Sequence, residues 1–175
     1  WQGANRGPDP VRLGSDTKQV AFVESPVTDP DRVLGRGCMA TGSSLVDTLQ
    51  PAQPGRKQVL WVARDVHNFA MSMSPDYRYE GGEVNGTLVH VLYQPGDEKT
   101  WGGGIVVNNT ITMLRWMAFI FGPYPWPQMT VVHRIEGGGT EFPMMEMNGS
   151  PSLGLNLHEG GHSYLMGILA NNEWK

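Results

Sequence analysis

The chain has 175 residues, with 13 Lys and Arg against 17 Asp and Glu, and a formal net charge of −4 at neutral pH. This acidic balance argues against binding to nucleic acid or to an anionic membrane surface, because both need a basic patch. The single cysteine excludes an internal disulfide framework and a Cys-rich zinc module. The longest apolar run, residues 117–121, is far shorter than the roughly 20 residues of a spanning helix, so no membrane span is predicted.

The first part of the chain, residues 1–58, is rich in Pro and Gly turn signals and poor in apolar residues. One short strand is predicted within it, at 19–24. Two apolar, β-prone runs follow at 59–63 and 69–73. This composition predicts β-structure with long irregular connections.

An Asn-Gly pair at 85–86 lies between two β-prone runs, 77–84 and 87–93. The pair predicts a tight hairpin, because both central residues of such a turn need a positive φ. Side chains should alternate along the second run, which places two sets on opposite faces: Leu88, His90 and Leu92 on one, and Val89, Val91 and Tyr93 on the other.

Helical and extended patterns alternate after a Gly-rich boundary at 95–104. Apolar residues three or four apart predict a helix over 105–121. A strand is predicted at 129–135 and a short one at 141–147. Ser150 is expected to cap a last helix, with Pro151 as its first residue and its end near Ala170.

The order of these elements predicts an α+β chain, in which a β domain ends near residue 94 and an α+β domain begins. Residue 1 is Trp, and the last five residues, Asn-Asn-Glu-Trp-Lys, have no character typical of a terminus. We therefore expect the chain to be a fragment of a longer protein.

The last predicted helix contains the sequence His158-Glu159-Gly160-Gly161-His162, an HExxH pattern. On a helix the two His side chains lie about 40° apart and one turn from each other, so both can bind one zinc ion. Glu159 can then act as general base toward a water molecule that the zinc activates. The alternative is a chance pair of structural histidines on one helix face.

A catalytic zinc site normally has three protein ligands. Leu165 and Ile168 occupy the positions where a metzincin has Gly and a third His, which excludes that class. Glu173, the only carboxylate after His162, is interpreted as a surface or capping residue. The adjacent Gly160 and Gly161 are interpreted as allowing close packing of another element, with room near the metal as the alternative.

From about Trp61 onward the sequence resembles the aminopeptidase N and leukotriene-hydrolase family of zinc metallopeptidases, which are gluzincins. Four segments carry the likeness, in the family's order and spacing: 63–70 with 74–77 resemble the end of the family's N-terminal β domain, 121–125 its FGxYP turn, 138–143 its GGMEYP or GAMEN segment, and 158–162 its HExxH motif.

The resemblance implies an N-terminal all-β domain, sandwich- or saddle-like, whose end is residues 1–94, and the first part of a thermolysin-like catalytic domain at 95–175. It also implies the role of each matched residue: His158 and His162 as zinc ligands, Glu159 as general base, Glu141 as the group that holds the free α-amine of a peptide substrate, and Gly138 and Gly139 as backbone beside the substrate chain.

Thr140 and Phe142 depart from the family's usual Met and Asn or Tyr, which concerns substrate preference more than reaction type. The family's third zinc ligand, a Glu, and its oxyanion-stabilising Tyr would lie beyond residue 175. We therefore expect a zinc aminopeptidase whose fragment is inactive alone. Two alternatives stay open: a non-catalytic zinc-binding module, and an endopeptidase of the same gluzincin group that does not recognise the amine.

Overall fold

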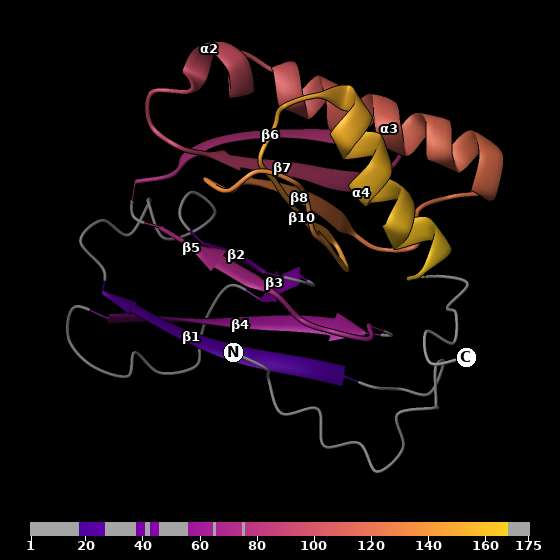
Figure 1. Ribbon diagram of the computed structural model, residues 1–175. Coiled ribbons are helices and arrows are strands. Elements are labelled where there is room, and N and C mark those ends of the chain that lie inside the picture. Colours follow the sequence, from indigo (N-terminus) through magenta and orange to yellow (C-terminus); the bar gives the residue numbers. More distant parts are fainter. Residues whose placement is uncertain are drawn as a thin grey trace.

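A computed structural model describes residues 18–26, 38–40, 43–45, 56–64, 66–74 and 76–167 (Figure 1). Five strands make up the first part of the described chain: β1 (Lys18–Pro26), β2 (Cys38–Ala40), β3 (Ser43–Leu45), β4 (Arg56–Arg64) and β5 (Met71–Met73). In the described part, β1, β4 and β3 form one antiparallel sheet and β2 pairs with β5. The strands predicted at 19–24 and 59–63 are confirmed within β1 and β4.

The remaining strands form a mixed five-stranded sheet in the order β6-β7-β8-β10-β9. Their bounds are β6 (Arg78–Val84), β7 (Thr87–Tyr93), β8 (Gln128–His133), β9 (Glu141–Phe142) and β10 (Met145–Asn148). The central strands β7, β8 and β10 are parallel, and an antiparallel strand closes each edge. The predicted hairpin between β6 and β7 is confirmed, because Asn85 and Gly86 both have positive φ, 52° and 83°.

The single strand predicted at 141–147 is instead two antiparallel strands, β9 and β10, separated by Pro143 and Met144. Met144 has a φ of 60°, a left-handed conformation that reverses the chain. Its side chain is buried, 1% exposed, which shows that packing holds the turn. Sequence periodicity did not indicate this turn because Met is rare in the left-handed region.

Three helices lie in the described part of the chain: α2 (Glu98–Trp101), α3 (Ile105–Phe121) and α4 (Leu153–Leu165). The bounds of α3 match the predicted helix, and α2 was not predicted. The cap predicted at Ser150 is wrong, because the hydroxyl of Ser152 accepts the hydrogen bond from the Leu155 N–H (3.2 Å). Among the described residues α4 ends at Leu165. The predicted helix end, Ala170, and Glu173 both lie in residues 168–175, outside the described part of the chain.

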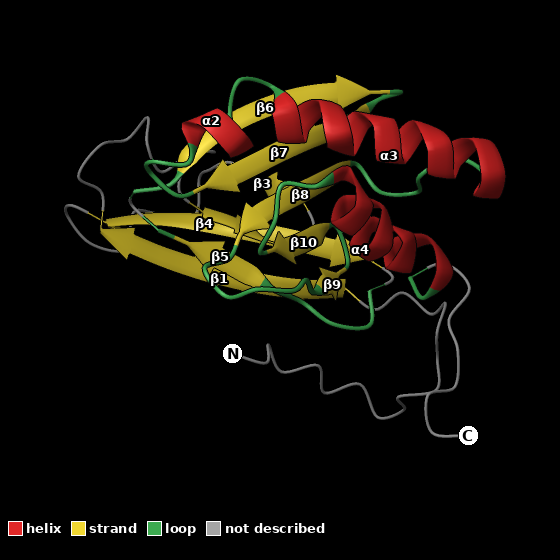
Figure 2. Ribbon diagram, turned by 45° about the horizontal axis from the view of Figure 1, so that its top comes forward, coloured by secondary structure: helices red, strands yellow, loops and turns green. Residues whose placement is uncertain are grey.

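The five-stranded sheet is covered on both faces (Figure 2). Helix α3 lies over β6 and β7, and α4 lies over β10 and β9. The alternation predicted for β7 is confirmed, since Val89, Val91 and Tyr93 face the helices while Leu92 faces the other side. On that other side Leu92 packs in one cluster with Trp61 of β4. The layers are therefore helix, sheet and the N-terminal strands.

Residue 94 directly follows β7, which is an interior strand of this sheet. The hairpin β6–β7 pairs with β8, in parallel register from Leu88–Gln128 to Leu92–Val132. A division of the chain at residue 94 would therefore cut a continuous sheet. The sequence could not reveal this pairing because β7 and β8 are separated by the whole of α2 and α3.

The segment Glu98–Phe121 is long and apolar enough to cross a membrane, judged by length and composition alone. A core helix passes the same test, and six residues of α3 are buried. The far end of α3 exposes large apolar side chains, with Phe119 89% exposed. The composition of this segment is thus weak evidence for a membrane span.

Candidate metal centre

Helix α4 is tied to α3 by side-chain hydrogen bonds that fix its rotation. The buried Asn156 amide donates to the Thr110 hydroxyl (3.0 Å), which itself donates to the Val106 carbonyl (2.8 Å). At the start of α4, the Asn109 amide donates to the Pro151 carbonyl (2.9 Å). These bonds place one face of α4 against the core and turn the other, which carries both histidines of the HExxH pattern, outward.

His158 and His162 bring their ring nitrogens together on this outward face. The two Nε2 atoms lie 3.4 Å apart, and the rings meet edge to face at 86°. Two nitrogens bound tetrahedrally to one zinc at about 2.0–2.1 Å would be roughly 3.3–3.4 Å apart. His158 is exposed and His162 half-buried. The distance between the two nitrogens and their exposure therefore allow both to bind one zinc ion.

Glu159 completes a group of three potential ligand atoms that lie within 4.8 Å of one another. Its side chain is buried, with 5% exposed, between α4 and the loop that precedes β9. Burial raises the pKa of Glu159, and His158 opposes this shift; the charge of Glu141 raises the pKa further, while those of His162 and Arg134 lower it. A carboxylate whose pKa is raised toward neutrality is a better proton acceptor in catalysis.

Gly139 lies directly against the Glu159 carboxylate. A Cβ atom at this glycine would be 2.5 Å from Cδ of Glu159, so a side chain there would overlap the carboxylate. Gly138 has a φ of 81° and is exposed, and its carbonyl accepts from the Gly149 N–H (2.8 Å). The Gly-rich segment therefore passes over the general base predicted from the sequence.

Glu141 opens β9 and lies opposite Glu146 of β10 in the antiparallel register. It is half-buried, and its charge acts on the pKa of Glu159. The structure thus gathers the predicted carboxylates and histidines at α4 and the neighbouring edge of the sheet.

The two glycines of the HExxH pattern allow close packing, as predicted. A Cβ at Gly160 would lie 2.5 Å from Cε of Met113 on α3 and 3.0 Å from Oε1 of Glu146 on β10. A Cβ at Gly161 would lie 3.1 Å from Cε of Met117. Both glycines are buried and face the core, so they bring α4 close to α3.

Gly160→Ala and Gly154→Ala are expected to change stability in opposite directions. Gly154 lies on the same helix with nothing within 4 Å of its would-be Cβ, so alanine should stabilise α4 by up to about 1 kcal/mol through helix propensity. At Gly160 the methyl must displace the fully buried Met113, and overpacking costs about 1–3 kcal/mol. Urea unfolding of both variants tests this; equal stabilisation would contradict the close packing.

Glu146 is a buried carboxyl group that the sequence analysis did not identify. It is 0% exposed, Oε2 accepts from the Asn148 amide (2.8 Å), and Oε1 has no hydrogen-bond partner among the described residues. Burial raises its pKa well above the ordinary value, and the charge of Glu159 adds to that shift. The only sequence signal was one Glu within an apolar run, Met144 to Met147.

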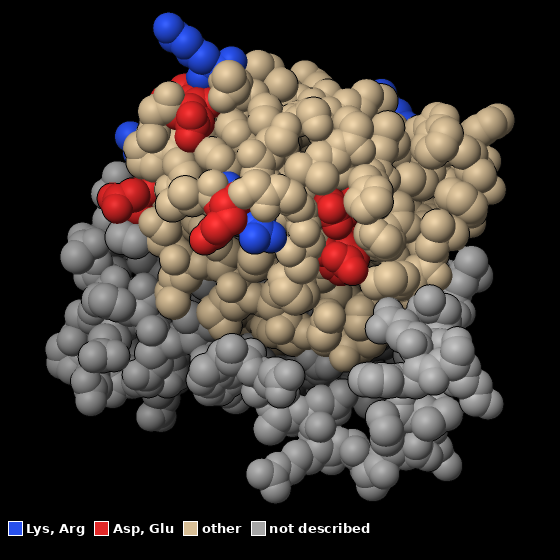
Figure 3. Space-filling model, viewed as in Figure 1, with Lys and Arg blue, Asp and Glu red and all other residues tan. Residues whose placement is uncertain are grey.

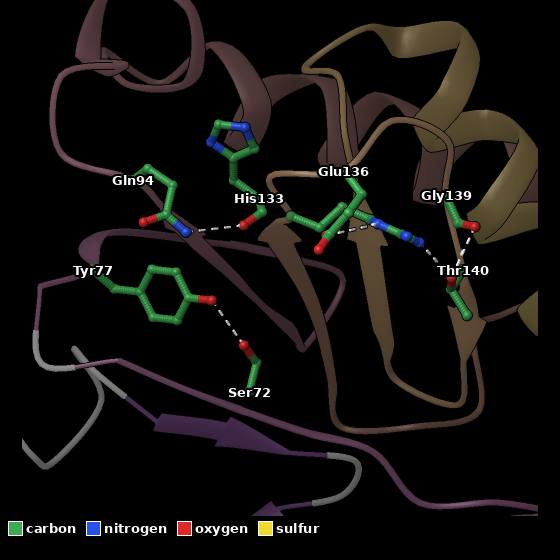
Figure 4. Close-up of polar contacts among 8 residues, drawn as sticks. Ser72, Tyr77, Gln94, His133, Glu136, Gly139 and Thr140 are labelled. Carbon is green, nitrogen blue, oxygen red and sulfur yellow. Dashed lines mark hydrogen bonds and ion pairs between the residues drawn. The ribbon is translucent and has the colours of Figure 1, made fainter.

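Two histidines outside α4, His90 and His133, have structural surroundings. His90 Nδ1 lies 3.0 Å from the Tyr79 hydroxyl. His133 stacks on Trp101, with ring centroids 4.2 Å apart, and faces Asp97 at 3.4 Å. Its carbonyl accepts from the Gln94 amide (Figure 4). These two histidines lie outside the group that could hold a metal ion.

Comparison with known proteins finds no matching family model and no similar curated protein. Solved structures do match. One is Legionella pneumophila aminopeptidase A in complex with aspartic acid, with a TM-score of 0.63 and 9% identity over 83% of this chain and 19% of that chain. Another is an M1 zinc metallopeptidase from Deinococcus radiodurans, with a TM-score of 0.62 and 18% identity over 86% of this chain and 34% of that chain.

The fold of this chain is similar to part of both of these solved structures. At these identities the likeness concerns the fold alone. The mixed α and β architecture with its five-stranded sheet is thus confirmed as similar to parts of such enzymes. The chain spans less than two fifths of the length of either structure.

Proposed function

We propose that this chain belongs to a zinc-dependent aminopeptidase, which removes N-terminal residues from peptides. The observation that supports this most directly is the pair of Nε2 atoms 3.4 Å apart, with the buried Glu159 beside them. The metallopeptidase fold of the structural neighbours agrees with it. We assign His158 and His162 as zinc ligands, because neutral imidazole is a ligand that zinc prefers.

Zinc, when bound, would polarise the scissile carbonyl and acidify a water molecule. Glu159 takes the proton from water and passes it to the leaving amine. Its burial against Gly139 keeps its carboxylate in one place and limits the solvent around it. The raised pKa of Glu159 brings its basicity closer to that required for proton transfer near neutral pH.

Glu141 pairs with the free α-ammonium group of the substrate and so sets which peptide bond lies at the metal. Its position at the start of β9, close enough for its charge to act on Glu159, supports this role. Gly138 and Gly139 lie in the segment that leads into Glu141 and would offer backbone groups to the substrate chain.

A complete catalytic zinc site needs a third protein ligand. Within the described residues, the group around His158 and His162 includes only Glu159 besides them. We assign Glu159 to the base, so the third ligand would come from elsewhere in the protein. The isolated chain is accordingly proposed to have little activity.

The domain boundary also changes in this proposal. Strands β6 and β7 belong to the sheet that carries β9 and β10, so the catalytic unit would include them. A boundary between β5, which ends at Met73, and β6, which begins at Arg78, would keep all three described sheets whole. The N-terminal strands would then form the end of a preceding β domain.

Free and N-acetylated versions of one peptide, cleaved by the full-length protein, distinguish the candidate functions. An aminopeptidase that pairs Glu141 with the ammonium should cleave the free peptide at least about tenfold faster, since a charge-assisted bond is worth roughly 1.5–3 kcal/mol. Glu141→Gln should abolish most of that preference. Equal rates would indicate an endopeptidase of the same group, and no cleavage by a zinc-loaded protein would indicate a non-catalytic module.

A further inference from the structure

The loop between β8 and β9 carries the residues proposed to meet the substrate, and glycine makes up much of it. Residues 134–140 connect the two strands, and 137–139 are all Gly. Glycine loses more conformational freedom on ordering than any other residue. A loop of this composition that must present Glu141 at a defined place therefore needs a restraint.

Backbone bonds hold the loop where it meets β10. The Arg134 N–H donates to the Asn148 carbonyl (3.0 Å), and Thr140 exchanges two hydrogen bonds with Met147 (3.1 and 2.9 Å). The Gly138 carbonyl accepts from the Gly149 N–H (2.8 Å). These bonds fix one side of the loop but leave the Gly139 carbonyl to other partners.

The Thr140 hydroxyl supplies that partner and joins it to the start of the loop. It donates to the Gly139 carbonyl (2.8 Å) and accepts from Nη1 of Arg134 (2.9 Å) (Figure 4). The Arg134 guanidinium group also lies 3.7 Å from Oε2 of Glu136. The two side chains therefore bridge the loop from its first residue to its last.

We propose that Arg134 and Thr140 form a clasp that positions Gly139 and Glu141 for binding of the substrate's N-terminus, which makes both of them positioning residues. This inference rests on the proposed aminopeptidase function. It also accounts for Thr140, where the resembled family usually has Met: a thioether can neither donate to the Gly139 carbonyl nor accept strongly from a guanidinium group.

The charge arrangement agrees with the clasp. The side chain of Arg134 is only 30% exposed. On the face seen in Figure 3, charged side chains form a few small groups on a largely uncharged surface, with basic and acidic side chains adjacent near its centre. A guanidinium group that is partly buried and hydrogen-bonded is more restrained than a solvated surface arginine.

Thr140→Val and Arg134→Gln in the full-length protein test the clasp. Valine keeps the shape of threonine and its suitability for a strand but removes the hydroxyl. Both variants should raise amide hydrogen exchange in residues 137–141. They should also raise KM for a free-amine peptide about tenfold, with a smaller change in kcat, because the lost charge-assisted bond positions a binding group.

Thr140→Ser keeps the hydroxyl and should restore both values to near those of the wild type. Arg115→Gln removes the same charge from the exposed face of α3 and is the matched control. Unchanged exchange in both clasp variants, or increased exchange with unchanged KM, would overturn the proposal. A wild-type protein that cleaves no peptide would overturn the aminopeptidase function instead, and the exchange data would still decide whether the clasp orders the loop.

Discussion

In the full-length protein, Glu159→Gln should lower kcat for peptide hydrolysis by about 10²–10⁴-fold, the usual contribution of a general base. Glutamine keeps the size and hydrogen-bonding shape of glutamate but cannot take a proton. The carboxylate is buried against Gly139, so the amide should occupy the same place without disturbing the loop. Zinc content and the unfolding temperature should change little, which makes the loss specific to proton transfer.

Glu83→Gln is the matched control, because Glu83 is exposed on β6 and lies outside the candidate site. Its activity should stay within a factor of about two of the wild type, since exposed substitutions usually have small effects. Steady-state kinetics with a free-amine fluorogenic peptide measure both variants. A Glu159→Gln enzyme that kept a tenth of the wild-type kcat would remove Glu159 from its assigned role.

In the full-length protein, His158→Ala and His162→Ala should each weaken zinc binding by more than about 100-fold. Loss of a hydrogen-bond partner behind a metal ligand already costs 10–100-fold in affinity, and loss of the ligand itself should cost more. The two imidazoles are the histidine donors in the only candidate metal group of the described chain. Metal analysis after gel filtration, together with competition against a chelator, measures the change.

His67→Ala serves as the control for removing an exposed histidine outside α4. It should retain one zinc ion per protein molecule and wild-type activity. A chelator should inactivate the wild type, and added zinc should restore it. Full zinc occupancy and unchanged affinity in either α4 variant would show that the metal, if bound, uses other ligands.

The sequence predicts those parts of the candidate site that depend only on the periodicity of a helix. The spacing of His158 and His162 needs only the geometry of a helix to bring two nitrogens together, and the observed 3.4 Å agrees with it. Glu159 follows for the same reason. The place of Glu141 came from a resemblance, and the structure brings it near Glu159 through the pairing of β9 with β10.

Other site features depend on contacts between segments far apart in the chain. Glu146 is fully buried because α4 covers β10, and its side chain lies beside Gly160 of the metal helix. The clasp joins Arg134 to Thr140 only because the loop folds back on itself along β10. A single Glu in an apolar run and an Arg six residues before a Thr carry no such information by themselves.

By itself the sequence determined the elements whose physics is local. The Asn85-Gly86 hairpin, the helix 105–121 and the HExxH spacing each depend on the φ preference or periodicity of consecutive residues. The tertiary structure alone decided that β7 pairs with β8 across residue 94 and that Met144 turns the chain between β9 and β10. Strand partners and buried turns are chosen by packing against distant segments, which no local pattern encodes.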